Sequence, residues 1–146
     1  MIDNFDRNRD FFWMVIFICW LVATVATLGS LFFSEVMEFV PCVLCWYQRV
    51  LMYPLVIIFL VGLFPLDKKV IKFSLPLVII GWLISLYHNL LYYGIIPENI
   101  SPCSKGVSCS TVYIKWFGFI SIPLLALASF TILLVLLITL HRRVYR

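Results

Sequence analysis

Residues 11–34 read FFWMVIFICWLVATVATLGSLFFS, a run of 24 residues without Asp, Glu, Lys or Arg. The hydrocarbon core of a bilayer is about 30 Å thick, and an α-helix needs roughly 20 apolar residues to cross it. Three further stretches lack these charged residues, at 50–66, 73–97 and 116–140. The pattern therefore predicts membrane-spanning helices over about 11–34, 43–65, 71–93 and 116–140.

The composition of the whole chain agrees with this interpretation. Hydrophobic residues make up 64% of its 146 residues and charged residues 12%, against roughly 45–50% and about 25% in soluble domains. A soluble protein of this size has too little interior to bury so much apolar surface. The composition excludes a soluble enzyme, a disordered chain and a nucleic-acid-binding protein. It predicts an all-α integral membrane protein, with residues 1–146 forming one four-transmembrane-helix bundle.

The positive charges indicate how the bundle is oriented. Cytoplasmic loops of membrane proteins carry an excess of Lys and Arg. Eight of the 11 such residues fall at the two termini or in the turn at 66–72: Arg7, Arg9, Lys68, Lys69, Lys72, Arg142, Arg143 and Arg146. We therefore expect a multi-pass protein of the cell membrane with both termini in the cytoplasm. The outer loops, 35–42 and 94–115, would lie on the extracytoplasmic side.

The five cysteines divide into one isolated residue and two pairs. Cys19 lies within the first predicted span, where a free thiol behaves as a small apolar residue. Cys42 and Cys45 form a C-x-x-C motif, and Cys103 and Cys109 are separated by five residues. Both pairs fall on the predicted outer side, where disulfides form and persist. The pairs are therefore the candidate catalytic residues.

The first pair lies where the second span begins. Pro41 favours the first turn of a helix, and the N-terminal end of a helix dipole stabilises a thiolate. Arg49 follows Cys45 by four residues, so both side chains lie on one helical face. A positive charge inside the membrane boundary is a functional-site candidate. The spacing predicts a redox-active dithiol with a neighbouring guanidinium.

Three other interpretations of these residues remain open. The pair could be a structural disulfide, although so small a ring removes little entropy from the unfolded chain. Arg49 could be a snorkelling anchor. The two cysteine pairs could together bind zinc, although an oxidising compartment and the charge of Arg49 disfavour this. We therefore predict no metal site.

The second pair indicates a relay of electrons. Its surroundings, residues 97–111, are polar and contain Pro and Gly, as is typical of an exposed loop. A soluble thiol protein could react with this loop, and the loop with the helical pair, by thiol–disulfide exchange. The sequence has no haem, flavin or metal motif to take the electrons, so we expect a lipid-soluble quinone. Arg49 and His88 come out at similar depth and could bind its oxygens, although His88 could equally be a packed imidazole.

The motif Pro-Cys-Val-Leu-Cys-Trp-Tyr-Gln-Arg at 41–49, followed by Met-Tyr-Pro at 52–54, resembles the DsbB family of membrane thiol:quinone oxidoreductases. The short spacing of the loop cysteines is most similar to the BdbC-like branch. The four predicted spans and the position of the second cysteine pair resemble this family too. The likeness therefore covers nearly the whole chain.

The resemblance implies a membrane thiol oxidase that reoxidises a DsbA-like thioredoxin-fold partner and passes the electrons to menaquinone or ubiquinone. Cys103 would form the mixed disulfide with that partner, and Cys109 would resolve it. Cys42 would exchange with the loop pair, and Cys45 would face the quinone as a thiolate. Arg49 would hold the quinone and His88 would lie near it.

Two alternatives to this function remain. A quinone reductase similar to vitamin K epoxide reductase would use similar cysteine pairs in a helical bundle to reduce a quinone-type substrate. A non-enzymatic membrane scaffold would use both pairs as structural disulfides. The loop spacing also differs from that of Gram-negative members, so the order of exchange within the loop stays open.

Overall fold

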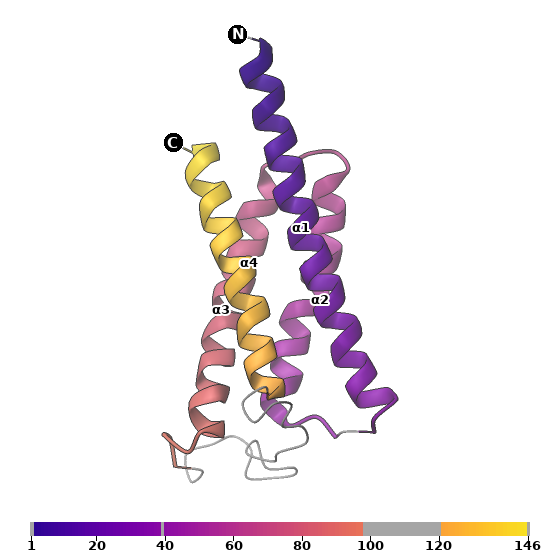
Figure 1. The fold of residues 1–146 in the computed structure, drawn as a ribbon, viewed down its shortest axis with the longest axis vertical. Coiled ribbons are helices and arrows are strands. Elements are labelled where there is room, and N and C mark those ends of the chain that lie inside the picture. Colours follow the sequence, from indigo (N-terminus) through magenta and orange to yellow (C-terminus); the bar gives the residue numbers. More distant parts are fainter. Residues whose placement is uncertain (1, 39, 98–120, 146) are drawn as a thin grey trace.

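The computed structural model describes residues 2–38, 40–97 and 121–145, and most of these residues lie in long α-helices (Figure 1). The helices are α1 (Ile2–Glu35), α2 (Val43–Leu63), α3 (Lys69–Tyr92) and α4 (Ile122–Tyr145). Each is long and apolar enough to cross a membrane. The prediction of an all-helical protein with four apolar helices is confirmed for the described part of the chain.

The helix ends differ in places from the predicted spans. The helix α1 starts at Ile2 rather than near residue 11, and in Figure 1 its N-terminal turns project beyond the other helices. Polar residues can continue a helix into water, so the start of an apolar run does not mark the start of the helix. The helix α4 ends at Tyr145, beyond the predicted 140, whereas residues 116–120 of that span lie outside the described residues.

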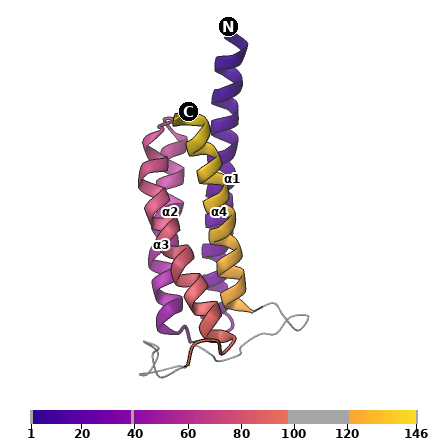
Figure 2. The same cartoon turned by 90° about the vertical axis from the view of Figure 1, so that its left-hand side faces the viewer.

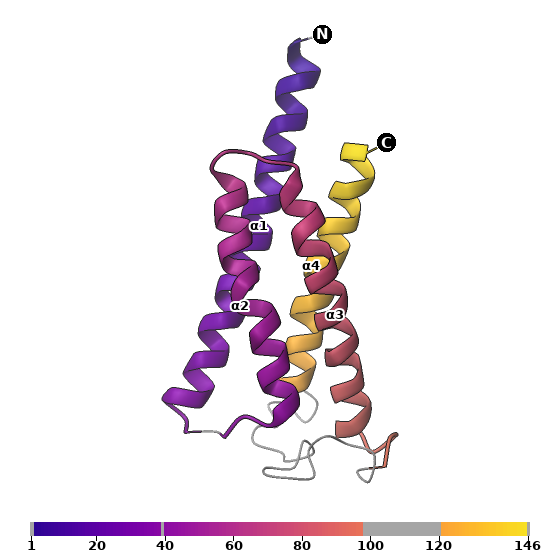
Figure 3. The same cartoon turned by 180° about the vertical axis from the view of Figure 1, so that it is seen from behind.

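The helices pack in a ring. The helix α1 packs against α2 and α4, and α3 packs against α2 and α4 on the other side. Figure 3, seen from behind, has α2 and α3 in front of the other two helices. The residues that fill the centre include Ile16, Cys19, Leu55, Phe59, Ile71, Phe130, Leu133 and Leu137. Cys19 is thus packed among apolar side chains, away from the other described cysteines.

Both ends of the chain lie at one end of this ring. The N- and C-termini and the connection between α2 and α3 are together, whereas α2 begins at the opposite end (Figure 2). The outward surface is apolar, with exposed side chains such as Val25, Leu28, Val50, Ile57, Val61, Phe73 and Val135. A surface of this kind is suited to lipid rather than water. The fold therefore places the start of α2 at the end of the bundle opposite the termini.

Candidate active site

The two cysteines of the C-x-x-C motif meet at the start of α2. Cys42 is the N-cap, with an extended backbone (φ −71°, ψ 169°), and its carbonyl accepts the first helical hydrogen bond, from the amide of Trp46. Cys45 follows in the first turn, so the two Sγ atoms lie 3.2 Å apart. Both are free thiols, as in the reduced form of a redox pair. The helix geometry therefore holds the sulfurs close enough to react with each other.

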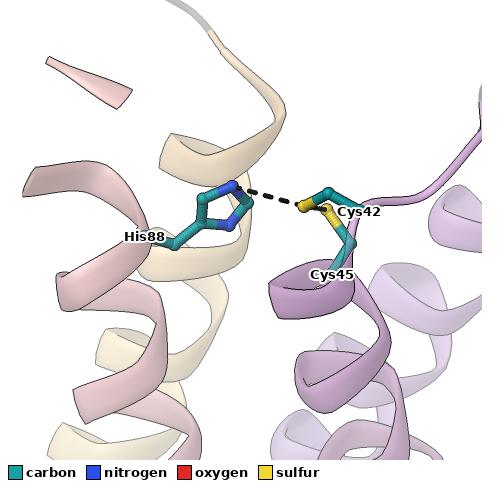
Figure 4. A group of neighbouring side chains, drawn as sticks. All are labelled: Cys42, Cys45 and His88. Atoms are coloured by element: carbon teal, nitrogen blue, oxygen red, sulfur yellow. Dashed lines mark hydrogen bonds between the residues drawn. The ribbon is translucent and has the colours of Figure 1, made fainter. Parts of the chain in front are cut away.

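The imidazole of His88 faces this dithiol from α3. Its Nε2 lies 3.7 Å from Sγ of Cys42, and Figure 4 shows the ring pointing across the gap from α3 to the sulfurs of α2. The side chain is only 1% exposed. A buried imidazole is costly unless both nitrogens have partners. His88 was predicted as a neighbour of the quinone, and the structure places it beside a reactive sulfur.

The second nitrogen of His88 is paired with Gln48. The Nε2 of Gln48 lies 3.3 Å from Nδ1 of His88, and both side chains are buried. An amide nitrogen can only donate, so Nδ1 accepts and the imidazole proton lies on Nε2. That proton then points toward Sγ of Cys42. Gln48 therefore selects the tautomer in which His88 donates to the sulfur.

Gln48 belongs to the motif at 41–49, but no role was predicted for it from the sequence. A signal was present, because Gln48 is an uncharged polar residue inside an apolar span and lies three residues after Cys45. An unpaired amide is expensive in a membrane, which calls for a polar partner on another helix. The identity of that partner depends on how α2 packs against α3.

The pKa of the Cys42 thiol is lowered to about 4. The main cause is the hydrogen bond from the Cys45 side chain, and the hydrogen bond from His88 lowers it further. These effects outweigh burial, which acts in the opposite direction. In the reduced pair, Cys42 is therefore the more acidic sulfur of a membrane-boundary dithiol.

The guanidinium of Arg49 is held by α1. Its Nε donates to Oγ of Ser30, and one Nη donates to the Ser30 carbonyl, each at 2.8 Å. Its Cζ lies 5.5 Å from the centre of the Trp46 ring. No hydrogen bond joins Arg49 to either sulfur among the described residues. Arg49 lines the same cavity as the dithiol, and its position is set by Ser30, a contact that was not expected from the sequence.

The dithiol opens on a cavity of about 500 Å³. Cys42, Cys45, Arg49 and His88 line it together with apolar side chains of α1 and α4. Val25 and Ile132 also line the cavity and are 61% and 48% exposed, so the cavity reaches the outer, lipid-facing surface. Ligand sites commonly have volumes of about 300–1,000 Å³ and mostly apolar walls. The cavity suits a flat apolar ligand that arrives from the membrane.

The second cysteine pair is not part of this description. Cys103 and Cys109 lie outside the described residues, as does most of the predicted outer loop at 94–115. Their roles, and the relay from loop to helix, stay predictions. The structure brings together Cys42, Cys45 and His88, with Arg49 at the edge of the same cavity.

Comparisons with known proteins agree with the resemblance seen in residues 41–54. The family profile described as disulfide bond formation protein DsbB matches residues 9–140. "Disulfide bond formation protein C" of Bacillus subtilis is 49% identical over 129 residues, which cover 88% of this chain and 91% of the relative. A "probable disulfide formation protein" of Metapseudomonas resinovorans is 44% identical over 132 residues, 90% of this chain and 92% of the relative.

A third relative, the "probable disulfide formation protein" of Oceanobacillus iheyensis, is 48% identical over 126 residues, which cover 84% of this chain and 85% of that protein. No solved structure gives a significant match to the chain. The matched residues include the whole of the cavity and the dithiol. The chain therefore belongs to the DsbB family of disulfide bond formation proteins.

Proposed function

We propose that this chain is a membrane thiol oxidase that takes two electrons from a DsbA-like thioredoxin-fold partner and delivers them to a membrane quinone. The family membership supports thiol oxidation in disulfide formation. The observation that carries the rest is the Cys42–Cys45 dithiol, which opens on an apolar cavity that reaches the lipid-facing surface. A dithiol in that position can give its electrons to an acceptor dissolved in the membrane.

The cavity fits a quinone headgroup in size and chemistry. Its volume of about 500 Å³ and its apolar walls from α1 and α4 suit a flat ring. Arg49 would hold a ring oxygen, because a guanidinium has five N–H donors and two of them bond to Ser30. The pair would give two electrons to a bound quinone and return to the disulfide, and the quinone would take up two protons, one from the pair and one from solvent.

Electrons enter the pair by thiol–disulfide exchange. A thiolate of the loop pair, Cys103 or Cys109, attacks Sγ of Cys42 in the Cys42–Cys45 disulfide. A sulfur–sulfur bond forms between the loop and Cys42, the bond to Cys45 breaks, and Cys45 leaves as a thiolate. The resemblance assigns the exchange with the loop to Cys42, and Cys42 precedes the first turn of α2 whereas Cys45 lies inside the helix. Arg49 follows Cys45 by four residues on the same face of α2, so its positive charge would favour the thiolate released at Cys45.

The second half of the exchange releases Cys42. The other loop thiol attacks its loop neighbour, the loop disulfide forms, and Cys42 leaves as a thiolate. Leaving-group thiols of low pKa depart faster, and the proton on Nε2 of His88 points at this sulfur. Cys42 and Cys45 then share one proton in the arrangement that the structure describes. His88 thus acts on the sulfur that must leave.

This interpretation also accounts for two different thiolates. The resemblance assigns the quinone-facing thiolate to Cys45, whereas the more acidic thiol of the free dithiol is Cys42. While Cys42 is bound in a mixed disulfide it carries no charge, and Cys45 is then the thiolate. Each sulfur is therefore ionised at a different step.

We further propose that the termini are cytoplasmic and the dithiol extracytoplasmic. Eight of the 11 Lys and Arg residues are at the termini or in the α2–α3 connection, and these segments lie at the end of the bundle opposite the start of α2. The positive-inside rule then supports this orientation. It would put the dithiol in the compartment where exported proteins acquire disulfides.

A steady-state assay tests the proposed activity. The purified full chain, supplied with a reduced thioredoxin-fold protein and a soluble quinone analogue, should reduce the quinone. The Cys45→Ser variant should be inactive, and Cys19→Ala, which alters a core thiol outside the cavity, should retain activity. Quinone reduction by Cys45→Ser at the parent rate would contradict the proposal. Net oxidation of quinol, with reduction of the oxidised partner, would show that the electrons run in the opposite direction and would also contradict the proposal.

A further inference from the structure

Three metal-binding side chains converge at the dithiol. The donor atoms of Cys42, Cys45 and His88 all lie within 4.8 Å of one another. The two sulfurs are 3.2 Å apart, and Nε2 of His88 is 3.7 Å from Sγ of Cys42. Figure 4 shows the ring and both sulfurs facing the same gap between α2 and α3. The arrangement is therefore a cluster of donors as well as a redox pair.

The distances suit a tetrahedral ion. Bonds of about 2.3 Å from zinc to sulfur and about 2.0 Å to nitrogen imply about 3.8 Å between two sulfur donors and about 3.5 Å between sulfur and nitrogen. The observed Sγ–Nε2 distance is 3.7 Å. The sulfurs, at 3.2 Å, need to separate by roughly half an ångström. The third pair, Sγ of Cys45 and Nε2 of His88, lies within 4.8 Å and needs to come to the same sulfur–nitrogen distance. Rotation of the Cys45 side chain changes both distances.

The surroundings supply the remaining features of such a site. Thiolate and imidazole donors favour zinc and other soft ions. Three protein ligands leave a fourth position open, and the cavity adjoins all three side chains. A metal-bound imidazole is oriented by a partner at its other nitrogen, which Gln48 occupies. With Nε2 bound to an ion, Nδ1 carries the proton, and Gln48 accepts it through Oε1 after its amide turns over.

The charge of Arg49 does not oppose this binding as strongly as the sequence suggested. Its Nε and one Nη are bonded to Ser30 of α1, so the guanidinium is held toward α1. Two thiolates more than offset one positive charge in the cluster. The site also differs from the four-cysteine zinc site considered from the sequence, because it uses His88 in place of Cys103 and Cys109.

We propose that the reduced Cys42–Cys45 pair and His88 form a binding site for a soft divalent metal ion such as Zn²⁺, present only in the dithiol state. On binding, the thiols release their protons to solvent, two metal–sulfur bonds and one metal–nitrogen bond form, and no electrons are transferred. In the disulfide the sulfurs have no thiolate charge to offer. The bound ion therefore keeps the cysteine pair reduced and stops its turnover. This inhibition rests on the proposed oxidase function, whereas binding of the metal ion does not.

The size of the effect follows from linkage. An ion that binds only the dithiol at 100 times its Kd favours that state about 100-fold. For a two-electron couple, a tenfold change corresponds to about 30 mV. The reduction potential of the pair should therefore rise by about 59 mV at that concentration of metal, and the pair becomes a poorer electron donor.

Cadmium titration of the full chain tests the binding site. The parent for the test carries Cys103→Ser and Cys109→Ser, so that the loop thiols do not compete, and it is reduced before Cd²⁺ is added. We expect one Cd²⁺ per chain, seen as a thiolate-to-cadmium charge-transfer band. The added change His88→Gln should weaken binding by about tenfold or more, and the matched change at the other histidine, His141→Gln, should leave it unaltered. Equal affinity with and without His88, or equal binding by the oxidised chain, would overturn the proposal.

X-ray absorption spectroscopy of the zinc-loaded, reduced parent checks the ligands without altering His88. Two sulfur donors and one imidazole nitrogen are expected, and a shell without imidazole would overturn the proposal even if His88→Gln fails to fold. In the wild-type chain, Zn²⁺ should slow quinone reduction and a chelator should restore it; binding without slowing overturns the inhibitory part. Quinone reduction without metal binding would support the oxidase function and refute the metal site. Metal binding without quinone reduction would support the metal site and refute the oxidase function.

Discussion

Replacing Gln48 with methionine removes the amide that donates to Nδ1 of His88 and keeps a side chain of similar length. The two atoms lie 3.3 Å apart, and both side chains are buried. The change leaves Nδ1 without a donor in an apolar setting. The tautomer with its proton on Nε2, which points at Cys42, then loses its advantage.

The expected magnitude follows from the burial of this hydrogen bond. Leaving a buried acceptor unpaired costs about 1–3 kcal/mol, and each 1.36 kcal/mol is a tenfold change in rate when it falls on the transition state. Departure of the Cys42 thiolate depends on the proton at Nε2. We therefore expect kcat for quinone reduction to fall about tenfold in Gln48→Met, with KM for the quinone changed less than twofold.

Two measurements check the reasoning. Steady-state kinetics separate kcat from KM, and nitrogen NMR of labelled histidine reports the tautomer of His88, with His141 as the second histidine signal. Ser74→Ala is the matched control. Ser74, in α3, is a buried polar side chain as Gln48 is, but it bonds to the Val70 carbonyl within its own helix. An unchanged tautomer, or a raised KM with kcat intact, would refute the positioning role and indicate that Gln48 contacts the quinone.

Other consequences can be measured independently. Because the pKa of Cys42 is lowered to about 4, the rate of its alkylation in the reduced chain should change less than about twofold between about pH 5 and pH 8. An ordinary thiol reacts about tenfold more slowly with each pH unit below pH 8, and that behaviour in Cys42 would contradict the prediction. Ser30→Ala removes one acceptor of Arg49 and should raise KM for the quinone about three- to tenfold, whereas an unchanged KM would show that this contact does not position Arg49. Gly81→Ala places a Cβ against a buried aromatic ring of α4 and should cost about 1–3 kcal/mol of stability, seen as a lower Tm; Gly29→Ala meets open space, and an equal loss there would contradict the packing argument.

The helices could be predicted from the sequence because the membrane imposes one requirement on every span. Charge-free runs long enough to cross a bilayer located all the helices in the described residues. The start of α1 at Ile2 was missed, because charged residues that lie outside a bilayer do not interrupt a helix. A run without charged residues shows which part of a helix can lie in lipid, but it does not show where the helical hydrogen bonding begins or ends.

The site was predictable only where its geometry is local. The three-residue spacing of Cys42 and Cys45 within one turn fixes their proximity, and the sequence contains that spacing. The contact of His88 with Cys42 joins residues 46 positions apart, and that of Arg49 with Ser30 joins residues 19 apart. Depth in the membrane placed Arg49 and His88 at one level, but the partner of each depends on the rotation of packed helices. That rotation is decided by the whole core.

A single-turnover experiment tests most directly whether the helical dithiol itself delivers electrons to the membrane acceptor. The chain carrying Cys103→Ser and Cys109→Ser is reduced, freed of reductant and metal, and mixed with excess quinone. Two electrons in the Cys42–Cys45 pair should yield one quinol per chain and leave the two sulfurs joined as a disulfide, as mass spectrometry of the digested chain would show. A chain that keeps both thiols and yields no quinol would contradict the account.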